Sequence, residues 1–367
     1  MLFFFIGTRA QFIKTFPVIM EAEKRGKDYR IINFGQHSKT IAELRQIFKV
    51  PCKQIFEPYP IHEDVSSLIE GLLWMKEMIK RFLIGHRHAG IFAGGGVAII
   101  HGNTVTTLLS LLTSKRAGLK VALIEAGLRS YNLFNPFPEE IFNIITAKFS
   151  DILFAPTLDD ARNLLGMKVK GEIICTNGNT IRDTLEFILK NVECRPESQT
   201  SEFGLVTIHR FENIFKRKNL EKIIGAINEV SVISPIIFIL HDSTKARLIT
   251  YNLYNSILRN KNIEILPVQR YDKFIELVRN SRFIMTDGGS MQEECAILGK
   301  PCLVMRRTTE RKDGLNENVF LWGLKIENLH NFMKAISAKK VSKNKDMTSK
   351  KNSPSVEIMN VLSRYDK

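Results

Sequence analysis

Short apolar runs alternate with amphipathic stretches along most of the chain. Runs such as LFFFI (residues 2–6), VAII (residues 97–100) and DILFA (residues 151–155) have the length of strands and are almost entirely apolar. The stretches between them repeat apolar residues at helical spacing, as in TVTTLLSLLTSKRAG (residues 104–118). Apolar strands that alternate with helices are typical of a parallel sheet covered on both faces. The pattern therefore predicts an α/β protein.

The alternation falls into two series, separated by the glycine-rich stretch GMKVKGEIICTNGNTIR at residues 166–182, which we interpret as a hinge. A chain of 367 residues also exceeds the usual size of one hydrophobic core. We expect two Rossmann-like, doubly wound domains, at residues 1–170 and 171–350. A short helix at residues 351–367 should pack back on the first domain, because one apolar face is formed by Val356, Met359, Val361 and Leu362.

The net charge of +15 favours anionic partners such as phosphates. Part of the excess comes from a lysine-rich segment, AKKVSKNKDMTSKK, at residues 338–351. We prefer a solubilising lysine bias to nucleic-acid binding, since no recognition-module motif occurs. The five cysteines are scattered singly, without a CxxC pair, which indicates a reducing compartment. No apolar run is long enough to span a membrane, so we expect a cytoplasmic protein with neither a nucleic-acid nor a membrane partner.

Two glycine turns follow predicted strands, where ligands bind in sheets of this kind. TDGGSMQEE (residues 286–294) can bring backbone N–H groups and a helix N-terminus to a phosphate, and one of its glutamates could bind a ribose. The alternative is an ordinary N-cap at Ser290. GTRAQFIK (residues 7–14) has the same layout, with Arg9 placed to reach a diphosphate and Lys14 further along. Neither turn matches a P-loop or a dinucleotide fingerprint.

The histidines and carboxylates at other strand ends suggest chemistry. His209 follows an apolar strand, and is either a phosphate contact or proton donor or a hydrogen-bonded strand-end histidine. Glu125 and Glu139 could form an acid/base pair, or an ion pair with Arg129 next to a helix N-terminus. No metal is expected, since nothing completes a ligand set around His86 and His88. The residues alone indicate a two-domain enzyme for a sugar nucleotide or similar phosphate ester.

A series of motifs extends this reading, in the order GTRAQFIK, GQH, HGNTVTTLL, EAGLRS, PFPEE, GNT, HRFEN, TDGGSMQEE, LGKPCLVMR and TTER. Together, from residue 6 to about residue 320, they resemble the UDP-N-acetylglucosamine 2-epimerase family, specifically its non-hydrolysing bacterial branch. The resemblance implies a glycosyltransferase type B arrangement, with a UDP-sugar in the interdomain cleft and UDP bound by the second domain. It also implies a homodimer and the absence of an oxidising cofactor.

The reaction implied by the resemblance inverts C2 of UDP-GlcNAc to give UDP-ManNAc for surface polysaccharide synthesis. UDP would be eliminated to give 2-acetamidoglucal and then added back, with a proton delivered to the opposite face. The resemblance assigns proton transfer to Glu125, Glu139 and the position that Asn103 occupies. His209 would also be catalytic, by stabilising the charge that develops on the departing phosphate. The resemblance assigns substrate binding to Arg9, Lys14, Arg129, Gly288, Gly289, Ser290 and Glu294, and Arg129 would in addition fix the approach of the acidic groups.

The chain departs from the family pattern at several positions. Asn103 stands where HGDT would be usual, and an amide cannot take up a proton as a carboxylate can. Phe211 replaces an expected arginine. Gln36, His37 and His241 match an allosteric UDP-sugar site of some members, but Phe211 puts that regulation in doubt.

Three alternatives remain open from the sequence. The chain could be a UDP-sugar-binding protein that is catalytically weakened by Asn103. It could act on a modified UDP-amino sugar, or hydrolyse its product to free ManNAc and UDP. A glycosyltransferase of the same fold is disfavoured by the pairing of EAGLR with PFPEE.

Overall fold

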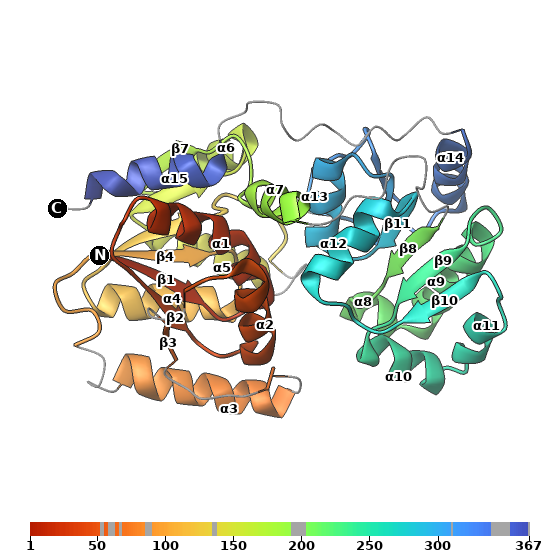
Figure 1. Cartoon of the computed structure of the whole chain (residues 1–367), viewed down its shortest axis with the longest axis horizontal. Coiled ribbons are helices and arrows are strands. Elements are labelled where there is room, and N and C mark those ends of the chain that lie inside the picture. The colour runs from red at the N-terminus through yellow and green to blue at the C-terminus, as the bar shows by residue number, and fades with distance from the viewer. Residues whose placement is uncertain are drawn as a thin grey trace. The chain divides into compact units, whose positions relative to one another are not determined.

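The computed structural model describes residues 1–51, 55–57, 63–65, 68–84, 90–133, 138–191, 203–309, 311–338 and 353–365. The chain divides into two compact units, one of residues 1–184 with 350–367 and the other of residues 185–349. In each unit a parallel sheet is flanked by helices (Figure 1). The predicted α/β class with two doubly wound sheets is therefore confirmed, whereas the expected domain boundary near residue 170 stays a prediction.

The first unit has a sheet of seven strands within the described residues, in the order β3-β2-β1-β4-β5-β6-β7. All of its strand pairs are parallel. The strand order reverses between β1 and β4, which is the position where ligands bind in such sheets. The strands are β1 (Leu2–Ile6), β2 (Tyr29–Asn33), β3 (Ile55–Phe56), β4 (Val97–His101), β5 (Lys120–Ile124), β6 (Ile152–Ala155) and β7 (Glu172–Cys175).

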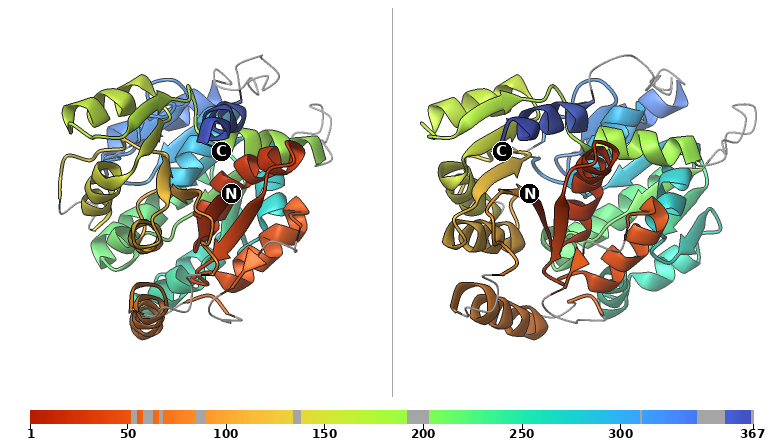
Figure 2. Two further views of the ribbon diagram at one scale, coloured as in Figure 1. Left: turned by 90° about the vertical axis from the view of Figure 1, so that its left-hand side faces the viewer. Right: turned by 60° about the vertical axis from the view of Figure 1, so that its left-hand side comes forward.

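The helices of the first unit include one from the far end of the chain. Helix α15 packs against α1, and Figure 2 shows these distant segments side by side. The Asp183 carboxylate accepts hydrogen bonds from Ser353 Oγ and Ser355 N at the start of α15. The helices are α1 (Arg9–Lys24), α2 (Ser38–Phe48), α3 (Leu68–Met78), a π-helix (Ile79–Ile84), α4 (Val105–Arg116), α5 (Glu139–Phe149), α6 (Leu158–Gly166), α7 (Ile181–Asn191), which runs into the second unit, α15 (Pro354–Leu362) and a 3-10 turn (Ser363–Tyr365).

The second unit has a six-stranded parallel sheet in its described residues, in the order β10-β9-β8-β11-β12-β13. Its strand order reverses between β8 and β11. The strands are β8 (Gly204–Thr207), β9 (Ile236–Ile239), β10 (Ile263–Leu266), β11 (Phe283–Thr286), β12 (Cys302–Val304) and β13 (Val319–Leu321). The helices are α8 (Phe211–Ile214), α9 (Arg217–Val230), α10 (Asp242–Thr250), α11 (Tyr254–Leu258), α12 (Tyr271–Asn280), α13 (Gly289–Leu298) and α14 (Ile326–Ser337).

The central strands, such as β1, β9 and β11, are almost entirely apolar because helices cover both faces of each sheet. Phe3, Phe4 and Phe5 are consecutive in β1 and all almost completely buried, although their side chains point to opposite faces. In β8, a Cβ on Gly204 would lie 2.2 Å from the ring of Phe283, so only glycine fits there. This rigid packing holds the strand ends, and the side chains that follow them, in fixed positions.

Helix α3 is the element that the strand-and-helix alternation did not reveal. Its apolar residues lie on both sides, which removes the one-sided pattern of a surface helix. Trp74 is buried and its Nε1 donates to the carbonyl of Phe34 at 2.7 Å. Ile69, Leu72 and Leu73 are instead exposed on the other side.

Candidate active site

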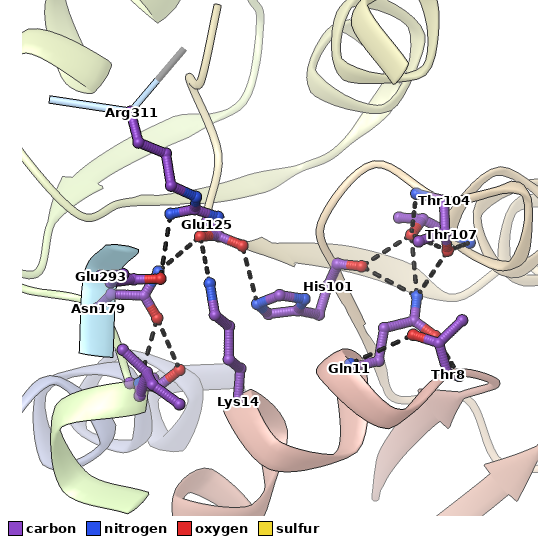
Figure 3. Close-up of polar contacts among 12 residues, drawn as sticks. Thr8, Gln11, Lys14, His101, Thr104, Thr107, Glu125, Asn179, Glu293 and Arg311 are labelled. Atoms are coloured by element: carbon purple, nitrogen blue, oxygen red, sulfur yellow. Dashed lines mark hydrogen bonds and ion pairs between the residues drawn. The ribbon is translucent and has the colours of Figure 1, made fainter. Parts of the chain in front are cut away.

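Glu125 lies at the centre of a buried polar cluster at the carboxyl end of the first sheet. Its Oε1 accepts from Lys14 Nζ at 2.6 Å and from Asn179 Nδ2 at 2.7 Å. Its Oε2 lies 3.2 Å from His101 Nε2, at an ion-pair distance but without the alignment of a hydrogen bond. Figure 3 shows the three side chains converging on the carboxylate from α1, from the end of β4 and from the loop before α7.

Burial makes these contacts strong. The side chains of Lys14 and Glu125 are only 3% and 5% exposed, so their attraction is poorly screened by water. Isolated buried charges would be costly, and each of these two is paired with the other. The structure thus brings together Lys14 and Glu125, to which the sequence gave substrate binding and proton transfer respectively.

The turn after β5 holds Glu125 in a conformation that is rare for a non-glycine residue. Its φ is +62°, in the left-handed region, and such strain is concentrated at functional sites. Gly127 follows with φ +95°, and a Cβ there would lie 2.3 Å from the Asp160 carbonyl oxygen. Only glycine fits at position 127, whereas Glu125 keeps an unfavourable backbone conformation in which its carboxylate lies against His101 at the end of β4.

Gln11 satisfies most of the free amides around the first glycine turn. Its Oε1 accepts from Gly7 N and Thr8 N at 2.9 and 3.1 Å. Its Nε2 donates to the His101 carbonyl, and also to hydroxyls that follow β4, those of Thr104 and Thr107 (Figure 3).

The Arg9 amide is also engaged, because it donates to Nδ1 of His37 at 3.2 Å. The backbone of GTRAQFIK is thus largely saturated by the chain itself, so Arg9 could reach a diphosphate only through its half-buried side chain.

The N-terminus of α13 in the second unit is different. Its N-cap residue is Gly288, and no side chain caps it. The interpretation of Ser290 as an N-cap is wrong, because Ser290 lies inside the helix with its side chain exposed. The first amides of an uncapped helix are available donors and carry the positive end of the helix dipole. This end of TDGGSMQEE is therefore suited to hold an anion.

Asp287, directly before this turn, anchors the loop that carries His209. Its carboxylate is fully buried and accepts from the backbone N–H groups of His209 and Arg210 and from Asn213 Nδ2. The His209 ring is 40% exposed, with Nδ1 3.5 Å from Asp287 Oδ1. A Cβ on Gly288 would lie 3.3 Å from the ring. His209 therefore lies beside the open end of α13.

The two glutamates of TDGGSMQEE are both buried in α13. Glu294 accepts a hydrogen bond from the Tyr271 hydroxyl at 2.7 Å. Glu293 pairs with Arg311 at 3.0 Å. These contacts fix the two carboxylates.

Arg129 pairs with Glu140, whose side chain is 1% exposed. The distance from Nε to Oε1 is 2.6 Å, and the other oxygen accepts from Ser130 N at 2.8 Å. The alternative in which Arg129 pairs with Glu125 or Glu139 is therefore wrong, because its carboxylate partner is Glu140, in the first turn of α5. Glu139 is half-buried at the first position of that helix.

The three residues assigned to an allosteric site lie in two units. In the first, Gln36 Oε1 accepts from Thr106 Oγ1 at 2.8 Å. Burial lowers the pKa of His37, the Asp64 carboxylate opposes this shift, and Arg9 adds to it. In the second, the His241 ring lies 4.8 Å from that of His209.

Asn103 and Phe211, two departures from the family pattern, both lie within the described residues. Asn103 is half-buried, two residues beyond the end of β4. Phe211 is 67% exposed and stacks on Phe215. His86 and His88 lie outside the described residues, as do residues 136–137 of PFPEE, Glu310 of TTER and the lysine-rich segment from residue 339.

Sequence reasoning assigned no role to His101, Asn179, Gln11 or Asp287. All four stand in motifs that had been noticed, HGNT, GNT, GTRAQFIK and TDGGSMQEE, close to the residues that were chosen. Their position after apolar strands was the available signal. What could not be read was which neighbouring strand end each side chain meets.

Two doubly wound parallel sheets, with charged side chains and an open helix N-terminus at their carboxyl ends, define a nucleotide-binding protein of the glycosyltransferase type B class. The sequence model of the family described as UDP-N-acetylglucosamine 2-epimerase matches residues 20–356. The chain belongs to this family.

Relatives that bear the name UDP-N-acetylglucosamine 2-epimerase occur in archaea and bacteria. The protein of Methanocaldococcus jannaschii is 33% identical over 319 residues, which cover 84% of each chain. That of Bacillus subtilis is 29% identical, over 90% of this chain and 85% of the relative. A crystal structure of the M. jannaschii enzyme in complex with UDP-GlcNAc and UDP has a TM-score of 0.80 at 30% identity, over 99% of both chains. One from Neisseria meningitidis, bound to UDP-GlcNAc, has a TM-score of 0.79 at 26% identity, again over 99% of both.

No helix among the described residues is long and apolar enough to cross a membrane.

Proposed function

We propose that this chain is a UDP-GlcNAc 2-epimerase that interconverts UDP-GlcNAc and UDP-ManNAc. The observation that carries the proposal is the buried Glu125, held by Lys14, Asn179 and His101 at the carboxyl end of a nucleotide-binding sheet. A carboxylate kept in a strained, desolvated turn is suited to proton transfer. The relatives that share this chain's length and fold carry the same activity in their names.

The reaction needs a proton acceptor and a stabilised leaving group. A base removes the C2 proton, the C2–H electron pair forms a double bond to C1, and the C1–O bond breaks with its electrons leaving on UDP. The reverse step re-forms the C1–O bond and returns a proton to the other face of C2. Because the C2 proton is a poor acid, most assistance must go to the departing diphosphate.

The proposed roles follow the chemistry of each group. Glu125 and Glu139 transfer protons, with Asn103 at the third acidic position of the family pattern. The uncapped turn of Gly288, Gly289 and Ser290 holds the diphosphate, which is supported by the absence of a side-chain cap on α13. The other proposed substrate contacts are Arg9, Lys14, His209 and Glu294, and Arg129 acts indirectly by fixing Glu140 at the start of α5.

Incubation with UDP-GlcNAc in deuterated water tests the activity directly. We expect UDP-ManNAc to appear with deuterium at C2, followed by NMR. A variant with Glu125→Gln should give no exchange, whereas the control Glu229→Gln in the second unit should behave as wild type. Free ManNAc would replace the proposal by the hydrolytic alternative, and binding without exchange would reduce the protein to a UDP-sugar-binding role.

We propose three further features of the protein. The two units act as the two domains of one enzyme, with the second holding UDP and α15 belonging to the first. The protein works in the cytoplasm, which is supported by free thiols at Cys175, Cys295 and Cys302. It forms a homodimer, which is supported by the exposed apolar side chains of α3, since such groups are typical of protein interfaces. Light scattering on wild type and on Leu72→Glu tests the dimer, and an unchanged mass would contradict the role of α3.

A further inference from the structure

The two oxygens of Glu125 are in different situations. Oε1 accepts two hydrogen bonds, at 2.6 Å from Lys14 Nζ and at 2.7 Å from Asn179 Nδ2. A carboxylate oxygen has two lone pairs, so these donors occupy both of those on Oε1. A proton that Glu125 takes up must therefore sit on Oε2, which is the oxygen that lies 3.2 Å from His101 Nε2.

The groups around Glu125 also differ in what they can do when its charge changes. The ammonium of Lys14 and the amide nitrogen of Asn179 can only donate, so they stabilise the carboxylate and not the acid. An imidazole can donate to a carboxylate when it is protonated and accept from a carboxylic acid when it is neutral. Of these three groups, only His101 can therefore stay in favourable contact with Glu125 in both protonation states.

The backbone holds His101 firmly enough for this task. Its side chain is 4% exposed at the last position of β4. Its carbonyl accepts from Gln11 Nε2 at 3.1 Å and from Thr107 Oγ1 at 2.7 Å, which leaves the strand end little freedom. The strand end that carries the ring is thus held by the protein itself, and the ring is buried beside Glu125.

We infer that His101 is a positioning residue for Glu125: the His101 ring keeps Glu125 Oε2 in place while that oxygen takes the proton from one face of C2. The inference rests on the proposed epimerase function and extends it to a residue that does not itself touch the sugar. In the elimination step the C2–H bond breaks, the proton bonds to Oε2, and the electron pair passes to the C1–C2 bond as UDP departs. The Lys14 cation remains beside Oε1 throughout and balances the carboxylate before the transfer.

Two substitutions of His101 separate this role from simple packing. His101→Phe keeps a flat ring but can neither donate nor accept, so we expect kcat to fall at least about tenfold with KM within threefold. The acidic limb of its kcat–pH profile should move upward by at least about half a pH unit, because the carboxylate loses a group that stabilises its charge. His101→Gln retains an amide that can donate and accept, so it should recover part of kcat and keep the limb near its wild-type position.

A matched histidine–glutamate pair provides the control. His330 Nε2 lies 2.9 Å from Glu229 Oε1 in the second unit, with the ring 53% exposed. His330→Phe should leave kcat and its pH profile unchanged. The inference is overturned if His101→Phe keeps kcat within twofold, or if it loses activity with its pH profile in the wild-type position.

A second measurement does not depend on turnover. Nitrogen-15 NMR of the histidine rings, with the His101 signals assigned by their loss in His101→Gln, follows the His101 titration with and without the neighbouring carboxylate. In Glu125→Gln the midpoint should fall by at least about half a pH unit, because an anion favours the imidazolium. An unchanged midpoint overturns the inference. Failure of wild type to exchange deuterium at C2 would overturn the proposed function instead, and the ring titration would still decide whether the two residues interact.

Discussion

Arg129 Nε donates to Oε1 of Glu140 at 2.6 Å, and Glu140 is the second residue of α5. The sequence offered two adjacent glutamates at the start of one helix, and the structure separates them into a buried ion pair and a half-buried carboxylate. Burial alone would raise the pKa of Glu140. The hydrogen bond from Ser130 N and the Arg129 guanidinium outweigh burial and hold that pKa below its ordinary value.

Glu140→Gln should therefore act on stability and Glu139→Gln on catalysis. Loss of the Glu140 charge removes a buried partner from Arg129, and we expect the free energy of unfolding to fall by about 2 kcal/mol in urea titrations. Because the folded-state pKa of Glu140 is lowered, its contribution is present above its unfolded pKa and is lost as pH falls through the folded value. Glu139→Gln should unfold like wild type and lose C2 exchange. The reverse pattern would exchange the two assignments.

Asn103→Asp should raise the epimerase rate at least tenfold, which corresponds to about 1.4 kcal/mol of barrier. The new carboxylate would stand beyond β4, beside the strand whose end carries Glu125, and could take up a proton that the amide cannot. Steady-state rates of UDP-ManNAc formation measure the effect. An unchanged or lower rate in a variant of wild-type stability would count against a catalytic role for this position.

Ser290→Asp should weaken UDP binding at least about tenfold, because it places a carboxylate at the helix end proposed to hold the diphosphate. Ser290 is exposed in the first turn of α13, so the substitution should leave folding intact. Calorimetric titration with UDP gives the dissociation constant. Ser256→Asp, another exposed serine of the second unit, is the control and should bind as wild type does. If both variants bound UDP with equal affinity, the proposal that the N-terminus of α13 holds the diphosphate would be wrong.

Lys300 predicts a measurable pH dependence of stability. Lys300 is 6% exposed, its ammonium donates to the Ser281 carbonyl at 2.9 Å, and burial lowers its pKa to about 8. The unfolded chain binds the proton up to a pH of roughly 10.4, so the unfolded state carries more protons between these values and stability rises with pH there.

The comparison with Lys300→Met isolates this effect from the other lysines. Between pH 7.5 and 9.5, the free energy of unfolding of wild type should gain about 1–2 kcal/mol relative to the variant in urea titrations. If the free energies of unfolding of the two proteins changed in parallel with pH, the pKa of Lys300 would not be lowered by its burial. Cys295, whose pKa is raised chiefly by burial, acts in the opposite direction in both proteins.

The sequence by itself determined the fold class and the edge of each sheet where function lies. A strand that is buried on both faces has no alternation of apolar and polar residues, so it appears in the sequence as a continuous apolar run. The charged or glycine-rich residues that follow such a run mark the edge of the sheet where ligands bind. On that basis Glu125, His209 and the turn at Gly288 were found at strand ends, where the structure has them.

Only the tertiary structure decided which of these groups meet. Lys14 and Glu125 are far apart in the chain and 2.6 Å apart in space. The choice of Glu140 over Glu139 by Arg129 depends on which side of α5 is buried. The two glycine turns look alike in sequence, yet Gln11 saturates the first and no side chain caps the second. Local patterns are set by burial along one element, whereas pairing is set by the packing of elements that are distant in the chain.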